Sequence, residues 1–131
     1  MKGFVINLEQ ETIANGDFRR VLYTGHHTQL VLMTLQPNEE IGSEVHQTVD
    51  QFFRFDEGEG KVVIDGFEHS VSNGFGVVIP AGAEHNVINT SDKPLKLYTL
   101  YSPPEHIDGT IRHTKADAIA QPEEFDGKTT E

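Results

Sequence analysis

Two short stretches of the chain carry residue types that bind metal ions. Glu44 and His46 are separated by one residue, Gln51 follows shortly after, and His85 lies behind the turn-forming segment Pro80-Ala81-Gly82. Residues two apart in a strand point to the same face, so Glu44 and His46 would enter the interior of a β-structure together. Gln51 would open the next strand, and the turn would present His85. The spacing predicts that these four side chains converge on one metal ion.

This set of donors has a defined metal chemistry. Imidazole nitrogen and carboxylate oxygen suit divalent Fe, Mn, Co, Ni or Zn, and two histidines with one carboxylate form the arrangement of non-haem Fe(II) sites. Gln51 would add a neutral amide oxygen and leave a site charge of about +1, so the ion would polarise carbonyl and hydroxyl groups. Asp50 replaces Gln51 as the ligand if the strand begins one residue earlier. We therefore predict a divalent transition metal as cofactor: Zn, Fe, Mn or Ni.

Short strands separated by turns must position these residues. Two strands are predicted within residues 18–35, and others over 41–46, 51–55, 60–64, 67–71, 75–79, 85–88 and 95–101. Gly, Pro, Asn and Asp fill the connections, and Asp65-Gly66 is a strong two-residue hairpin signal. Tyr98 and Tyr101 fall on opposite faces of the last strand by parity. Many short strands with regular turns predict an all-β sandwich or barrel.

The pattern changes after residue 101. Ser102-Pro103-Pro104 cannot continue a central strand, and residues 102–131 carry little hydrophobic periodicity. We interpret them as a C-terminal tail of a single domain spanning 1–131, with its barrel over about 18–101. Within the tail, residues 114–120 predict a short helix with Thr114 as its N-terminal cap and Pro122 beyond its end.

The spacing around His85 carries a family resemblance. Gly74, Pro80, Gly82, His85 and Asn89 stand at every defined position of the second cupin motif, whereas the first motif is matched in spacing by Glu44-x-His46, Gln51 and Gly58 with two ligand types changed. The chain therefore resembles small single-domain cupins of the cupin 2 type, including those labelled mannose-6-phosphate isomerase-like. The resemblance implies an antiparallel double-stranded β-helix, or jelly-roll barrel.

The composition limits the classes of molecule that the protein is expected to bind. The formal net charge of −11 leaves no basic surface for nucleic acid or anionic membranes. The chain contains no Cys, which suits a reducing cytoplasm, and Glu9 stands where a secretory signal would be apolar. We expect a cytoplasmic protein that binds a small-molecule substrate and forms a homodimer, because edge strands of small sandwiches are commonly protected by pairing.

Three functions stay open from the sequence. The first is an isomerase or lyase whose metal acts as a Lewis acid on a sugar-like molecule or a hydroxy or keto acid. Small cupins with Gln at the position of Gln51 include uronate ring-opening proteins, so the resemblance favours this function. The others are a non-haem iron dioxygenase and a vestigial, non-catalytic cupin that binds metal or sugar. His26, His27, His69, His106 and His113 are not assigned to the site.

Overall fold

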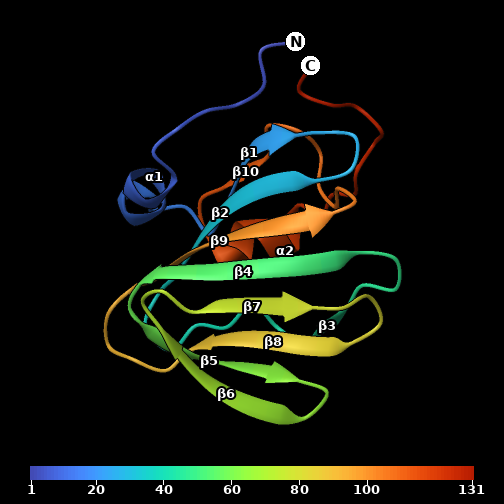
Figure 1. Cartoon of the computed structure of the whole chain (residues 1–131). Helices are drawn as coiled ribbons and strands as arrows, with labels where there is room; N and C mark the ends of the chain where they lie inside the picture. The colour runs from blue at the N-terminus through green and yellow to red at the C-terminus, as the bar shows by residue number, and fades with distance from the viewer.

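The structure is a computed structural model that describes all 131 residues, and short antiparallel strands are its main regular secondary structure (Figure 1). The strands are β1 (Arg19–Thr24), β2 (Gln29–Leu35), β3 (Glu44–Val45), β4 (Asp50–Glu57), β5 (Glu59–Ile64), β6 (Phe67–Ser72), β7 (Gly76–Ile79), β8 (Glu84–Asn89), β9 (Leu95–Ser102) and β10 (Ile111–Arg112). Two helices, α1 (Leu8–Ala14) and α2 (Lys115–Ala120), flank them. No helix has the length and hydropathy needed to span a membrane.

Two sheets enclose the core. One has the strand order β10-β1-β2-β9-β4-β7 and the other β3-β8-β5-β6, and all neighbours are antiparallel. Strands that lie side by side, such as β4 and β9, are far apart in the sequence, which is typical of a jelly roll. The prediction of an all-β jelly-roll barrel with a short C-terminal helix is therefore confirmed.

Alternation along the strands decides which side chains enter the barrel. In β9, every second side chain from Leu95 to Tyr101 is buried, and β4 buries Gln51, Phe53 and Phe55. Tyr98 lies on the outer face, so the predicted opposite orientation of Tyr98 and Tyr101 is confirmed. The same alternation that buries the phenylalanines carries Gln51 into the interior.

The predicted strand over 41–46 is shorter in the structure. Only Glu44–Val45 pairs as β3, with an isolated bridge between Glu40 and Ile88 before it. Gly42 lies between them with φ of +109°, which interrupts the extended backbone. His46 therefore follows β3 rather than belonging to it.

Helix α1 was not predicted. Its seven residues offer little apolar periodicity, but Asn7 caps it by accepting a hydrogen bond from Gln10 N–H at 3.1 Å. Thr12 is fully buried, and the helix packs on β4 and β9. The Asn7-to-Gln10 spacing was the signal available in the sequence.

The C-terminal segment, residues 102–131, follows the barrel closely. β10 pairs with β1 and adds a strand to the larger sheet. The predicted helix forms as α2, with the Thr114 hydroxyl accepting from Asp117 N–H at 3.0 Å. The chain end returns to the start, where the main-chain N–H groups of Lys2 and Gly3 donate to the Glu131 carboxylate (Figure 1). The segment is thus an integral layer of the fold.

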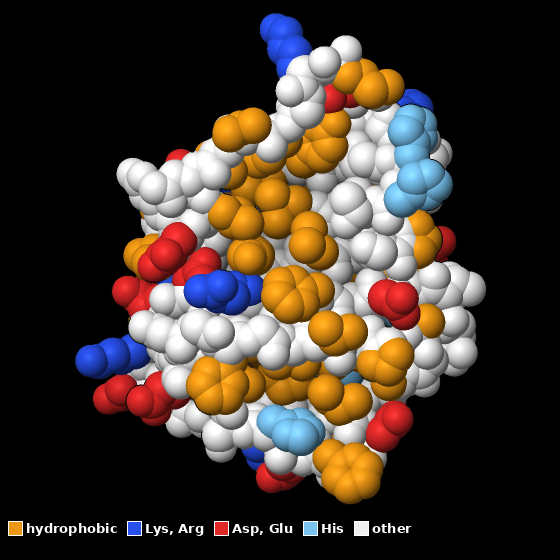
Figure 2. Space-filling model, viewed as in Figure 1, with side chains coloured by type: hydrophobic (Ala, Val, Ile, Leu, Met, Phe, Trp, Pro, Cys, Tyr) orange, Lys and Arg blue, Asp and Glu red, His pale blue; other side chains and the backbone are white.

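The outer face of the larger sheet carries a row of apolar side chains. Val78, Phe52, Leu100 and Leu30 are successive cross-strand partners on β7, β4, β9 and β2. Figure 2 shows hydrophobic side chains gathered over this face, and Val78 is 67% exposed. The row is wider than the single exposed apolar residues common on monomers.

Candidate metal centre

Two cross-strand pairs face each other inside the barrel. Glu44 on β3 pairs with His85 on β8, and Gln51 on β4 pairs with Tyr101 on β9. Side chains of directly opposed residues share one face of a sheet. Because the pairs belong to different sheets, their side chains meet between the two layers.

His46 reaches the same place from the connection after β3. Its carbonyl accepts from Gly82 N–H at 2.8 Å, and the Asp50 carboxylate accepts from Ala81 N–H at 2.8 Å. These bonds join the connection that carries His46 to the turn that precedes His85. They also hold the exposed Asp50 at that turn, whereas Gln51 is 2% exposed and points inward. The register therefore favours Gln51 over Asp50 as the interior residue.

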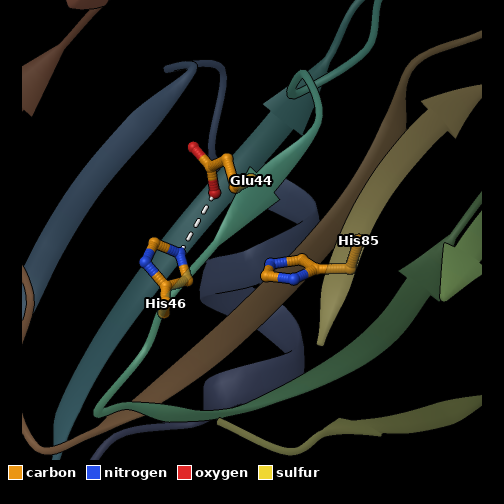
Figure 3. A group of neighbouring side chains, drawn as sticks. All are labelled: Glu44, His46 and His85. Carbon is orange, nitrogen blue, oxygen red and sulfur yellow. Dashed lines mark hydrogen bonds and ion pairs between the residues drawn. The ribbon is translucent and has the colours of Figure 1, made fainter. Parts of the chain in front are cut away.

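Three of the predicted residues form a compact donor group (Figure 3). One ligating atom from each of Glu44, His46 and His85 lies within 4.8 Å of the others. Gln51 joins them, because its Oε1 lies 3.2 Å from His85 Nε2. His85 is 4% exposed, whereas the Glu44 side chain is 34% exposed, so the group opens to solvent on the Glu44 side.

The orientation of His85 tests whether a cation fits. Its Nδ1 lies 3.0 Å from the carbonyl oxygen of Ala83, and a carbonyl only accepts, so Nδ1 carries the proton. The lone pair of a neutral His85 then lies at Nε2 and faces Gln51 Oε1, while the Gln51 amide donates to Thr99 Oγ1 at 3.0 Å. A divalent ion beside these two atoms would be bound by both of them, so the arrangement suits a cation.

The separations match a coordination shell. Donor atoms bonded to one ion at about 2.1 Å lie about 3.0–3.4 Å apart at neighbouring octahedral or tetrahedral positions. His85 Nε2 and Gln51 Oε1 are 3.2 Å apart, as are His46 Nε2 and Glu44 Oε2. The residues therefore fit a divalent ion, and Glu44, His46 and His85 are a group that could hold one.

In the absence of an ion, the negative charge of Glu44 is balanced by its close contact with His46. Burial would raise the pKa of Glu44, but the hydrogen bond and charge of His46, with the charges of His85 and Arg19, lower it below its ordinary value. The Glu44 contact raises the pKa of His46 against the opposing effect of burial. A metal ion would thus compete with a proton for His46.

Two neighbours of the site were not found from the sequence. Glu105 Oε1 lies 3.6 Å from His46 Nδ1. Arg19 on β1 is mostly buried, lies 3.3 Å from Glu123, and acts on Glu44 and Tyr101 through its charge. Both residues come from parts of the chain outside the motifs, and no local spacing signals them.

The remaining histidines lie elsewhere. His106 is 7% exposed, with Nδ1 2.9 Å from Glu123 Oε1, and its ring packs edge-on against Tyr101 at 5.0 Å. His113 pairs with Asp17 at the surface, and His26, His27 and His69 are exposed. None of these belongs to the donor group.

Other residues of the two motifs have structural roles. Gly58 has φ of +99°, and a Cβ there would lie 2.7 Å from the carbonyl oxygen of Pro94. The Asn89 side chain donates to the carbonyl oxygens of Leu35 and Lys93 at 3.0 and 2.7 Å. These residues shape the far end of the barrel and do not contact the donor group.

Similarity to known proteins agrees with this architecture. The Cupin_2 family, described as a cupin domain, matches residues 31–101. The uncharacterized protein YrkC of Bacillus subtilis is 46% identical over 125 residues, which are 91% of this chain and 67% of YrkC. The crystal structure of BH2720 from Bacillus halodurans is 46% identical with a TM-score of 0.90, covering 92% of this chain and 96% of that chain.

A more distant neighbour shares the fold alone. It is described as a sugar phosphate isomerase from a cupin superfamily, from Silicibacter pomeroyi, with 24% identity, a TM-score of 0.58 and coverage of 69% of this chain and 62% of that chain. The family match, the jelly roll and the donor group at the motif positions agree: this chain belongs to the cupin family.

Proposed function

We propose that this cupin is a metal-dependent enzyme that isomerises or eliminates from a small polar molecule. Glu44, His46, Gln51 and His85 would hold a divalent ion, which when bound supplies Lewis acidity to a carbonyl or hydroxyl oxygen. The observation that carries the proposal is the contact of His85 Nε2 with Gln51 Oε1, two buried acceptors held 3.2 Å apart. A neutral fourth ligand leaves more positive charge for the substrate than a carboxylate would.

Tyr101 supports acid catalysis in the same place. It is 3% exposed, and its ring meets that of His46 edge-on at 6.0 Å. Burial, and then the charge of Glu44, raises the pKa of the phenol, so it stays protonated at neutral pH. We propose that Tyr101 donates a hydrogen bond to the oxygen on which negative charge develops.

The cations around the site indicate the substrate class. Arg19 is the basic side chain whose charge reaches Glu44 and Tyr101, and it is already paired with Glu123 at 3.3 Å. A phosphate group normally requires a free cationic clamp. We therefore propose that the substrate carries no phosphate group. It would be either a sugar-like molecule or a hydroxy or keto acid.

A second function rests on the same donors. Two histidines and one carboxylate with open positions are the ligand set of non-haem Fe(II) oxygenases, and Glu44, His46 and His85 form that set. Oxygen consumption by the iron-loaded protein in the presence of substrate would favour it over the isomerase.

The oligomeric state is part of the proposal. The row of Val78, Phe52, Leu100 and Leu30 on the outer sheet face supports a homodimer, because burying it would remove apolar surface from water. We also propose a cytoplasmic location, which the absence of Cys supports.

Metal analysis and deuterium exchange test the function. The protein is purified without added metal and assayed by elemental analysis, then incubated in D₂O with sets of aldoses, ketoses and 2-hydroxy or 2-keto acids. An isomerase introduces deuterium beside the carbonyl, and a lyase adds alkene signals, both visible by proton NMR. The His85→Ala variant is the matched control. The proposal is wrong if the metal-loaded protein and this variant leave every compound equally unchanged.

A further inference from the structure

Glu105 faces the metal centre from outside the donor group. Its Oε1 lies 3.6 Å from His46 Nδ1, while His46 Nε2 lies 3.2 Å from Glu44 Oε2. Each ring nitrogen of His46 thus has its own carboxylate, one on the side of the donor group and one on the opposite side. The Glu105 side chain is 31% exposed, so this second carboxylate borders solvent.

The backbone of Glu105 is fixed by groups from distant parts of the chain. Gln29 Oε1 accepts from the N–H groups of Glu105 and His106 at 3.2 and 2.9 Å, and Gln29 is fully buried. The carbonyl of Glu105 accepts from Phe125 N–H at 2.9 Å. Both main-chain polar groups of Glu105 are therefore occupied, and only its side-chain torsions remain free.

The C-terminal segment strengthens this placement. Glu123 lies next to His106 at 2.9 Å and pairs with Arg19 and Arg112 at 3.3 and 3.4 Å. These contacts hold residues 105–106 and 123–125 against the same end of the barrel. The segment beyond β9 thus carries and fixes a group that contacts the site.

A carboxylate beside Nδ1 of His46 influences whether Nε2 carries a proton or a free lone pair. A neutral imidazole carries one proton, and an acceptor at Nδ1 keeps it there, which leaves the Nε2 lone pair for a metal. In the metal-free structure the shorter contact is the hydrogen bond between Nε2 and Glu44 at 3.2 Å, and Glu105 at 3.6 Å lies at ion-pair distance. A metal ion bound at Nε2 displaces a proton from that atom, so the proton of a neutral His46 then lies on Nδ1, which faces Glu105. A charged partner also increases the basicity of the ligating nitrogen.

We propose that Glu105 is a positioning residue: it accepts the Nδ1 proton of His46 when Nε2 binds the metal, and it orients the ring for that bond. The inference rests on the metal site proposed above. His85 has a comparable partner at its own Nδ1, but this partner is a neutral group, the main-chain carbonyl of Ala83 at 3.0 Å. The two histidines thus have one neutral and one charged outer partner.

Zinc titration with three variants tests the inference. Zn²⁺ affinity at pH 7.5 is measured by competition with a chelating dye for the wild type, Glu105→Ala, Glu105→Gln and Glu124→Gln. Glu124 is an exposed acid of the same segment, and its variant controls for the loss of one charge. We expect Glu105→Ala to weaken binding roughly 10–100-fold, Glu105→Gln to weaken it less because its amide oxygen still accepts, and Glu124→Gln to leave it unchanged.

A second readout separates positioning from general destabilisation. In the zinc-bound wild type, the His46 Nδ1 proton should give a resolved downfield NMR signal that exchanges slowly with water, and this signal should disappear in Glu105→Ala with the melting temperature of the metal-free protein unchanged. Equal zinc affinity in wild type and Glu105→Ala would overturn the role of Glu105 alone. A wild type that binds no zinc, iron, manganese or nickel would overturn the metal site and this inference with it.

Discussion

Replacing Gln51 by Glu changes the charge of the site with almost no change in shape. Gln51 Oε1 lies 3.2 Å from His85 Nε2, and its amide donates to Thr99 Oγ1. The Thr99 hydroxyl can rotate and donate to a carboxylate, so the new side chain keeps its partner. The variant should fold, and it tests whether this position faces a cation.

The size of the effect follows from the distance between the two carboxylates. The Glu44 and His85 ligating atoms lie within 4.8 Å, and Gln51 Oε1 is 3.2 Å from His85, so a glutamate at position 51 lies no more than about 8 Å from Glu44. Two charges at about 8 Å repel by about 2 kcal/mol at an effective dielectric constant near 20. A divalent ion between them removes this repulsion, which corresponds to at least about 30-fold tighter binding.

Calorimetric titration at pH 8.5 measures this directly. A high pH limits the competition between protons and the metal ion for the ligands. We expect Gln51→Glu to melt at a lower temperature than the wild type without metal and to bind Zn²⁺ or Mn²⁺ more tightly, while polarisation-dependent activity falls. Gln36→Glu, an exposed position with the same charge change, is the control. Unchanged or weaker affinity in Gln51→Glu would refute the placement of an ion beside this residue.

Four further changes have defined outcomes. His85→Ala should lower metal affinity more than 100-fold, beyond the range of outer-shell losses, whereas His69→Ala should not; equal metal content in both would place the site elsewhere. Gly58→Ala should cost about 2–3 kcal/mol in chemical denaturation, because of its φ of +99° and the 2.7 Å approach of its Cβ to a carbonyl oxygen, and an unchanged midpoint would contradict the strain. Burial raises the pKa of Glu123, but His106, Arg19 and Arg112 outweigh it and lower the pKa below 4.5. This carboxylate therefore stabilises the fold above the pKa of the unfolded chain and loses that contribution as the pH falls through its folded value; Glu123→Gln should cost about 3 kcal/mol at pH 7 and much less at pH 3, and a constant difference across urea melts would argue against the network. Light scattering should give a dimer at micromolar concentration that Val78→Asp shifts toward monomer, and a monomeric wild type would end that proposal.

Local patterns in the sequence predicted most of the barrel. Alternation with a period of two placed Gln51 on an interior face and Tyr98 and Tyr101 on opposite faces, because successive side chains of a strand must point to opposite sides. The Asp65-Gly66 signal forms the β5–β6 hairpin with φ of +47° and +85°, the left-handed pair that such a turn requires. Thr114 predicted the start of α2 because a cap satisfies N–H groups only a few residues away.

The pattern failed where a local signal competed with the rest of the fold. The strand expected over 41–46 was reduced to β3 by the backbone turn at Gly42, so the same-face reasoning for His46 does not describe how that residue reaches the site. The hydrogen bond from Gly82 N–H to the main-chain carbonyl of His46 holds this residue at the site. Helix α1 was missed because its stability comes from packing on β4 and β9 more than from its own sequence.

The sequence alone determined which residue types stand at the candidate metal centre, because the motif fixes their spacing, and strand parity placed Gln51 on the interior side. Only the tertiary structure decided what surrounds them. Glu105 and Arg19 lie far along the chain from the donors they influence, and they arrive because the C-terminal segment returns to pair with β1 and to bury Glu123. Hydrogen bonds and charges act over a few ångströms whatever the separation in sequence, so these partners exist only once the chain has folded.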